Sequence, residues 1–86
     1  MKEVDARLIT QAKALVANDQ QLLASLFQLR KKAGISQAVV AQRMGVTQPA
    51  IAALESHDSN PTLSTLRRYA LAIGAKLTYA AESDDC

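Results

Sequence analysis

Four basic side chains are the residues of this 86-residue chain best placed to bind a charged partner. They lie between positions 20 and 54, a stretch that contains no Asp or Glu; they are Arg30, Lys31, Lys32 and Arg43. The acidic residues lie before and after this stretch, and the net charge of the chain is only +2. A basic centre of this kind is typical of a surface that contacts the phosphates of a nucleic acid. The run 30–32 also fits a second interpretation, a solvated helix end whose cations complement the helix dipole.

Catalysis and metal binding have no set of residues to carry them. His57 is the single histidine and Cys86 the single cysteine. The sequence shows no nucleophile paired with a base, no metal-ligand cluster and no glycine-rich phosphate loop. We therefore expect no enzymatic activity, no metal and no cofactor. We interpret His57 as an exposed turn residue and Cys86 as an incidental thiol.

Residues 35–55 predict two short helices joined by a tight turn. Ser36 is a good N-cap for the first helix, and Gly45 can take the left-handed conformation that ends it. Thr47 caps the second helix, and Pro49 lies in its first turn, where a missing N–H has no cost. Alanines stand where the two helices would touch. This arrangement is a helix-turn-helix, whose second helix can enter the major groove of DNA.

Three further helices flank this motif in the prediction. Apolar residues at helical spacing place them over 2–17, 20–32 and 63–73, with a break at Asn18-Asp19 and a stop at Gly74. The helix over 20–32 carries two apolar stripes, although a helix buried on one side needs only one. The stripes are Leu22, Leu26 and Leu29, and Leu23 and Phe27. We expect the second stripe to receive the N-terminal helix or a partner subunit.

Residues 76–80 alternate between polar and apolar, which predicts a strand. A solitary strand leaves its backbone groups unpaired, and the rest of the chain offers it no mate. Pairing with the same segment of a second molecule, through Leu77 and Tyr79, would form an antiparallel ribbon across a twofold axis. The alternative is a frayed tail. We predict a homodimer.

The fold class is therefore all-α, with five helices and a short C-terminal β-strand that pairs across the dimer. The expected division is an N-terminal helical extension over 1–18, a helix-turn-helix domain over 19–75, a dimerisation strand over 76–81 and an acidic tail over 82–86. The composition agrees, because 49% of the residues are hydrophobic and only 3% are aromatic, which suits closely packed helices. No apolar run approaches the about 20 residues of a membrane span, and the N-terminus has no signal-peptide core. We expect a cytoplasmic protein that does not contact membranes.

The motif resembles the Xre-type helix-turn-helix family of phage repressors. The resemblance covers roughly residues 22–74 and rests on several positions together: Ser36, Gln37, Ala41, Gly45, Thr47, Gln48, Ile51 and Glu55. The ending PTLSTLRRYALAIGAKLTYAAE is similar to bacterial antitoxins of the HigA and HipB kind, in which a helix followed by a strand completes the dimer. The resemblance implies a transcriptional repressor that binds double-stranded DNA at a palindromic operator. It also implies a toxin protein as a second partner.

The resemblance assigns roles to individual residues. Gln37 matches a position that contacts the DNA backbone, and Thr47 and Gln48 match the start of the recognition helix. Gln48 can bond bidentately to adenine, and Thr47 can reach a phosphate or a thymine methyl group. The resemblance also pairs Arg30 with Glu55 in an ion pair that clamps two helices together. Arg30 is thus expected either in this ion pair or at a phosphate. The other three cations, Lys31, Lys32 and Arg43, are expected to contact phosphates.

The recognition helix departs from the family pattern because few of its side chains can donate to bases. Pro49 gives no side-chain hydrogen bond, and Ala52 and Ala53 replace polar residues. Ala50 and Ala53 can still touch thymine methyl groups, and DNA shape can supply the rest of the specificity. An alternative is a protein-interaction module in which DNA binding is weak or vestigial. Its surface would be formed by Leu23, Phe27 and Val39, the last of which stands where the family often has an exposed acid.

Overall fold

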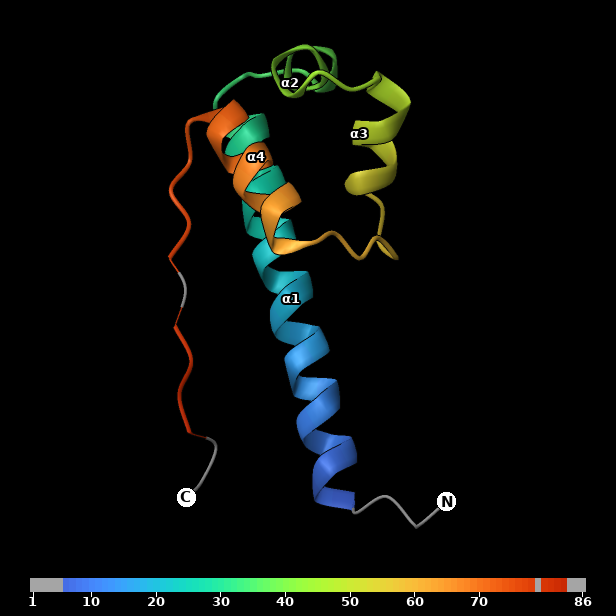
Figure 1. The fold of residues 1–86 in the computed structure, drawn as a ribbon, viewed down its shortest axis with the longest axis vertical. Helices are drawn as coiled ribbons and strands as arrows, with labels where there is room; N and C mark the ends of the chain where they lie inside the picture. The colour runs from blue at the N-terminus through green and yellow to red at the C-terminus, as the bar shows by residue number, and fades with distance from the viewer. Residues whose placement is uncertain (1–5, 79, 84–86) are drawn as a thin grey trace.

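A computed structural model of the chain describes residues 6–78 and 80–83. The described residues form an all-helical fold, as predicted, with four helices (Figure 1). These helices are α1 (Ala6–Lys32), α2 (Gln37–Met44), α3 (Gln48–Leu54) and α4 (Leu63–Ile73). The second half of α1 packs beside α4, α2 crosses one end of this pair, and α3 runs from α2 along the other side of the domain from α4 (Figure 1).

The helix ends follow the capping residues of the sequence. Ser36, Thr47 and Thr62 precede α2, α3 and α4. The side-chain oxygen of each accepts a hydrogen bond from the backbone N–H three residues later, at 3.1, 3.3 and 3.2 Å respectively. Gly45 ends α2 with φ of 70°, in the left-handed region that glycine occupies without strain. These predicted helix boundaries are confirmed.

The prediction of a break at Asn18-Asp19 is wrong, because α1 runs through both residues as one helix of 27 residues. Neither residue breaks a helix in the way that glycine or proline does, since each lowers helix propensity by less than about 1 kcal/mol. Ending one helix and starting another would require a second, unfavourable nucleation step. The chain therefore has one long helix in place of two, and its N-terminal part cannot fold back onto the helix that it continues.

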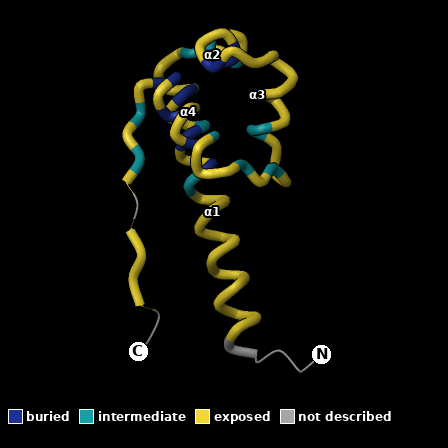
Figure 2. The backbone as a smooth tube through the Cα atoms, in the orientation of Figure 1, coloured by how far each residue is buried: buried dark blue, intermediate teal, exposed yellow. Residues whose placement is uncertain are grey.

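The core lies where the second half of α1 meets the other three helices (Figure 2). Its most buried large side chains, none more than 2% exposed, are Leu26, Val40, Ile51 and Tyr69. The ring of Phe27 packs edge-on against Tyr69, with centroids 5.7 Å apart. Of the predicted stripe residues, Leu23 and Leu26 are buried and Leu22 and Phe27 are half-buried, but Leu29 is 47% exposed. The assignment of Leu29 to a covered stripe is therefore not supported within this chain.

The segment after α4 is extended, and no strand is formed in its described residues (Figure 1). The strand predicted over 76–81 is thus not observed in residues 76–78 and 80–81. Leu77 is half-buried against the core of its own chain. Tyr79, the other residue expected at the dimer contact, lies outside the described residues, as does Cys86.

Candidate nucleic-acid interface

The helix α3 presents one face to the core and the other to solvent. Ile51 is 1% exposed and Leu54 is half-buried, so these two side chains anchor the helix. The outer positions are all exposed: Gln48, Pro49, Ala50, Ala52 and Ala53. Apart from Gln48, this face has no side chain that can donate or accept a hydrogen bond. It can therefore approach another surface closely, with its only polar side chain at the N-terminal end.

The junction between α2 and α3 is fixed by backbone hydrogen bonds. Val46 N–H donates to the carbonyl of Ala41 at 2.9 Å, and Gly45 N–H donates to Gln42 at 3.2 Å. Ala41 is 4% exposed, which shows that the small side chain expected at the helix contact is buried. Thr47 follows at once and holds the first turn of α3 through its oxygen. Because its hydroxyl hydrogen is not used by that cap, Thr47 can still donate to an acceptor outside the chain.

Glu55, the residue that follows α3, binds side chains from the other three helices. Arg30 of α1 donates to both carboxylate oxygens, through Nε at 2.7 Å and Nη2 at 2.9 Å. Gln37 of α2 donates through Nε2 to Oε1 at 3.0 Å. Tyr69 of α4 donates through its hydroxyl to Oε2 at 2.5 Å. We call these four residues the Glu55 cluster.

The Glu55 cluster is buried and internally satisfied. The side chains of Arg30 and Glu55 are 9% and 8% exposed. The remaining guanidinium nitrogen of Arg30, Nη1, donates to the carbonyl of Ile35 at 2.8 Å, which ties the loop before α2 to the same site. Among the described residues, no buried side-chain nitrogen or oxygen lacks a hydrogen-bond partner. A bidentate arginine–carboxylate pair with this many added donors is a strong form of ion pair.

The cluster shifts the pKa of its ionisable members in the directions that maintain the charges. Burial acts to raise the pKa of the Glu55 carboxyl, but the hydrogen bonds from Arg30, Tyr69 and Gln37 outweigh it and lower that pKa below 4.5. The hydrogen bond to Glu55 raises the pKa of Arg30. Burial, followed by the bond to Glu55, raises the pKa of Tyr69. The carboxylate and guanidinium are therefore both charged, and the phenol is neutral, at neutral pH.

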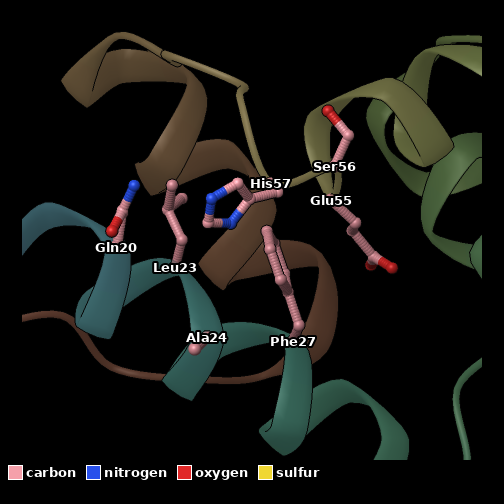
Figure 3. A pocket seen from close by; sticks show the side chains of 7 residues that line it. All are labelled: Gln20, Leu23, Ala24, Phe27, Glu55, Ser56 and His57. Carbon is pink, nitrogen blue, oxygen red and sulfur yellow. The ribbon is translucent and has the colours of Figure 1, made fainter.

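A small cavity of about 270 Å³ lies between α1 and the turn that follows α3 (Figure 3). Figure 3 shows the His57 ring facing into it, with Leu23 and Phe27 of α1 among its walls. His57 itself is exposed, in agreement with the prediction of a turn residue. No group of three or more His, Cys, Asp or Glu residues in the described part of the chain could hold a metal ion. Within the same residues, no helix is long and apolar enough to cross a membrane.

Comparison with known proteins places this geometry in a family. Residues 26–79 match a helix-turn-helix family model, a range that includes α2, α3, α4 and the cluster around Glu55. The chain belongs to the Xre-type helix-turn-helix family. Two similar curated proteins, each called antitoxin HigA1, come from two strains of Mycobacterium tuberculosis, CDC 1551 / Oshkosh and H37Rv. Each is 46% identical to this chain over 63 residues.

The match covers 73% of this chain but 42% of each relative, so the chain spans about two-fifths of the length of these relatives. No solved structure matches the chain.

Some of the residues expected to contact DNA are exposed in the structure, whereas others hydrogen-bond to groups of the chain itself. Gln48 and Thr47 lie together at the exposed start of α3. Lys31 and Lys32 are exposed at the end of α1. Gln37, by contrast, is half-buried and uses one amide hydrogen on Glu55, which leaves its second amide hydrogen for an outside acceptor.

Arg43 has an internal partner that the sequence did not reveal. Its Nη1 donates to the carbonyl of Ala72 at 2.6 Å, at the end of α4. In the reverse direction, Arg68 of α4 donates through Nη2 to the carbonyl of Met44 at 2.6 Å, at the end of α2. Each arginine thus satisfies a terminal carbonyl of the other helix and lies near the negative end of its dipole. Arg68 is therefore an exposed residue that also ties α4 to α2.

Removal of the Arg30 side chain should leave the Glu55 carboxylate buried without its cation. We expect Arg30→Met to lower the free energy of unfolding by about 3–5 kcal/mol. Lys32→Met is the matched control, because Lys32 is an exposed cation on the same helix, and its effect should stay within about 0.5 kcal/mol. Urea unfolding followed by circular dichroism measures both values. Equal losses for the two variants would contradict a structural role for the pair.

The low pKa of Glu55 also predicts how stability depends on pH. Because this pKa is lower in the folded chain than the ordinary value of 4.5, the carboxylate stabilises the fold above that value, and the effect is lost as the pH falls through the folded pKa. Glu55→Gln has nothing to titrate at this position. The difference in unfolding free energy between the wild type and this variant should be largest at neutral pH and shrink in acid. A difference that is constant with pH would show that folding does not change the pKa of Glu55.

Proposed function

We propose that the chain is a transcriptional repressor that reads double-stranded DNA by inserting α3 into the major groove. The exposed outer face of α3, held by the Glu55 cluster in an Xre-type motif, is the observation that carries the proposal. The chain acts by binding and not by catalysis, and its site of action is the cytoplasm, where its DNA target would lie.

Each exposed residue near α3 has a role that suits its chemistry. Gln48 reads an adenine through two hydrogen bonds, and the flat apolar surface of Pro49, Ala50 and Ala53 packs on thymine methyl groups. The remaining contacts go to the DNA backbone, which fixes the position of α3 without reading sequence. They come from Lys31, Lys32, Thr47, Gln37 and the free donors of Arg43. Since only one side chain of α3 can hydrogen-bond a base, DNA shape supplies the remaining discrimination.

The repressor acts as a homodimer on a palindromic operator. Two copies related by a twofold axis would place their α3 helices in successive major grooves, about 34–36 Å apart. Pairing of residues 76–81 across the axis remains our proposal for the dimer contact. It is supported by the extended course of residues 76–78 and 80–81, the described part of this segment, and by the hydrogen-bond partners that an extended backbone needs.

The similarity to two proteins named antitoxin HigA1 supports a second role for the chain, as the antitoxin of a toxin–antitoxin pair. In this role it would bind a toxin protein and repress the promoter that its own gene shares with the toxin gene. The protein-interaction module that we considered from the sequence is the outcome that remains if DNA binding is absent.

Replacement of Gln48 should weaken sequence discrimination more than general affinity for DNA. We expect Gln48→Ala to lose about 1–3 kcal/mol of preference for the specific site, a roughly 5- to 150-fold fall in specific affinity. Gln11→Ala is the matched control, because Gln11 is an exposed glutamine near the N-terminal end of α1, and this variant should bind as the wild type does. Fluorescence anisotropy at several salt concentrations measures the affinity for DNA from upstream of the gene and the affinity for random DNA. Equal and negligible binding of the two DNAs by the wild type would refute repression.

The antitoxin role predicts a stable complex with the product of the neighbouring reading frame. That product should arrest growth when expressed alone and should copurify with this chain, which should restore growth when coexpressed. An unrelated helix-turn-helix protein of similar size serves as the control for nonspecific rescue. A neighbouring product that neither binds the chain nor impairs growth would remove the antitoxin role while leaving DNA binding intact.

A further inference from the structure

The first half of α1 extends beyond the core and is exposed along its whole described length. All residues from Leu8 to Gln21 are exposed, and Figure 2 shows this part of the helix without buried positions. Four of these residues are large and apolar: Leu8, Ile9, Leu15 and Val16, between 45% and 58% exposed. These four side chains are in contact with water, and burial of their apolar surface against a partner would stabilise this part of the helix.

These four residues form a stripe in line with the face of α1 that packs in the core. At 3.6 residues per turn, Leu8 and Ile9 lie about five turns before Leu26 and Phe27, and so point in the same directions. Val16 lies about two turns before Leu23, which is buried. The apolar face of α1 thus continues without a change of direction from the core into solvent. We call Leu8, Ile9, Leu15 and Val16 the α1 stripe.

A groove of about 510 Å³ adjoins the α1 stripe where the helix enters the core. Its floor includes Val16 and Leu23 of α1. Its opposite wall includes Pro61, in the loop before α4, and Leu63, the first residue of α4. Asp19 and Asp58 line the same groove and make it acidic. The groove therefore combines apolar side chains with polar and acidic ones, and its two carboxylates would favour a cation on an incoming amphipathic helix.

We propose that the α1 stripe of a second copy of this chain occupies this groove, in an antiparallel pair of α1 helices centred on Val16. About this centre, Ile9 of each copy meets Leu23 of the other, and Val16 meets itself. Lys13 of each copy then lies opposite Asp19 of the other, so that the acidic groove receives a cation. The stripe and the groove are on the same chain, which makes the contact self-complementary, as a twofold interface requires. A parallel pair would instead place Lys13 beside Lys13 and Asp19 beside Asp19.

This contact goes beyond the proposed function, because it uses neither α3 nor residues 76–81. A chain with two separate twofold contacts can link dimers to one another. The contact can be tested without DNA, so its failure and the failure of DNA binding are distinguishable.

A charge exchange between Lys13 and Asp19 tests the partner directly. In the full chain, Lys13→Asp and Asp19→Lys should each place like charges across the contact and raise the dissociation constant of this self-association by about tenfold or more. The double variant should restore it. The two residues are six positions apart on one helix and do not face each other, so restoration cannot arise within a single chain. Sedimentation velocity over a range of concentrations measures the constants, and circular dichroism confirms that each variant is folded.

Cross-linking gives a second measurement that does not change the charge. In a Cys86→Ser background, Val16→Cys should form a disulfide-linked dimer on mild oxidation, because this residue meets itself at the twofold axis. Leu29→Cys, on the same helix but outside the stripe, should not cross-link. Independent effects of the two charge variants, or equal cross-linking at both positions, would overturn the proposal. So would protection of Val16→Cys from a thiol reagent only when a toxin is present, since the stripe would then be a toxin surface.

Discussion

The orientation of α3 depends on one buried carboxylate. Glu55 stands at the end of the recognition helix and accepts hydrogen bonds from Arg30 of α1, Gln37 of α2 and Tyr69 of α4. A carboxylate at a helix C-terminus is unfavourable with respect to the helix dipole, and its burial carries a desolvation cost. The position is favourable because the three donors together compensate for both. Since each donor comes from a different helix, the carboxylate fixes the position of α3 relative to the whole domain.

This arrangement connects the DNA-facing surface to the core. Gln37 uses one amide hydrogen on Glu55 and keeps the other for an outside acceptor, so a phosphate bound there would touch the same network that holds α3. Arg43 and Arg68 tie α2 to α4 through terminal carbonyls in a comparable way. The helices around α3 are therefore joined by directional polar contacts as well as by apolar packing. A rigid support matters for the proposed function because α3 has only seven residues, and Gln48 is its one side chain that can hydrogen-bond to a base.

The sequence predicted the local features well and the long-range ones poorly. Caps and turns depend on one or two residues, so Ser36, Gly45, Thr47 and Gly74 were sufficient to place the ends of α2, α3 and α4. The resemblance to the Xre-type family paired Arg30 with Glu55, and the structure has the two side chains 2.7 Å apart. The hydroxyl of Tyr69 and the guanidinium of Arg43 were missed as partners, because nothing local in the sequence shows which distant atoms they reach. The break in α1 was predicted from two residues that disfavour a helix only weakly, and the cost of a second nucleation outweighed them.

The continuity of α1 has a consequence for assembly. A break near residue 18 would have allowed the N-terminal segment to fold back and cover its own apolar side against Leu22 and Phe27. In an unbroken helix that side lies farther along α1, beyond the reach of α2, α3 and α4, and the described part of the C-terminal segment leaves it exposed. The α1 stripe keeps the direction of the core face because both belong to one helical surface. Its cover must therefore come from outside the described residues, and a helix with the same pattern and complementary charges is the partner that fits its groove.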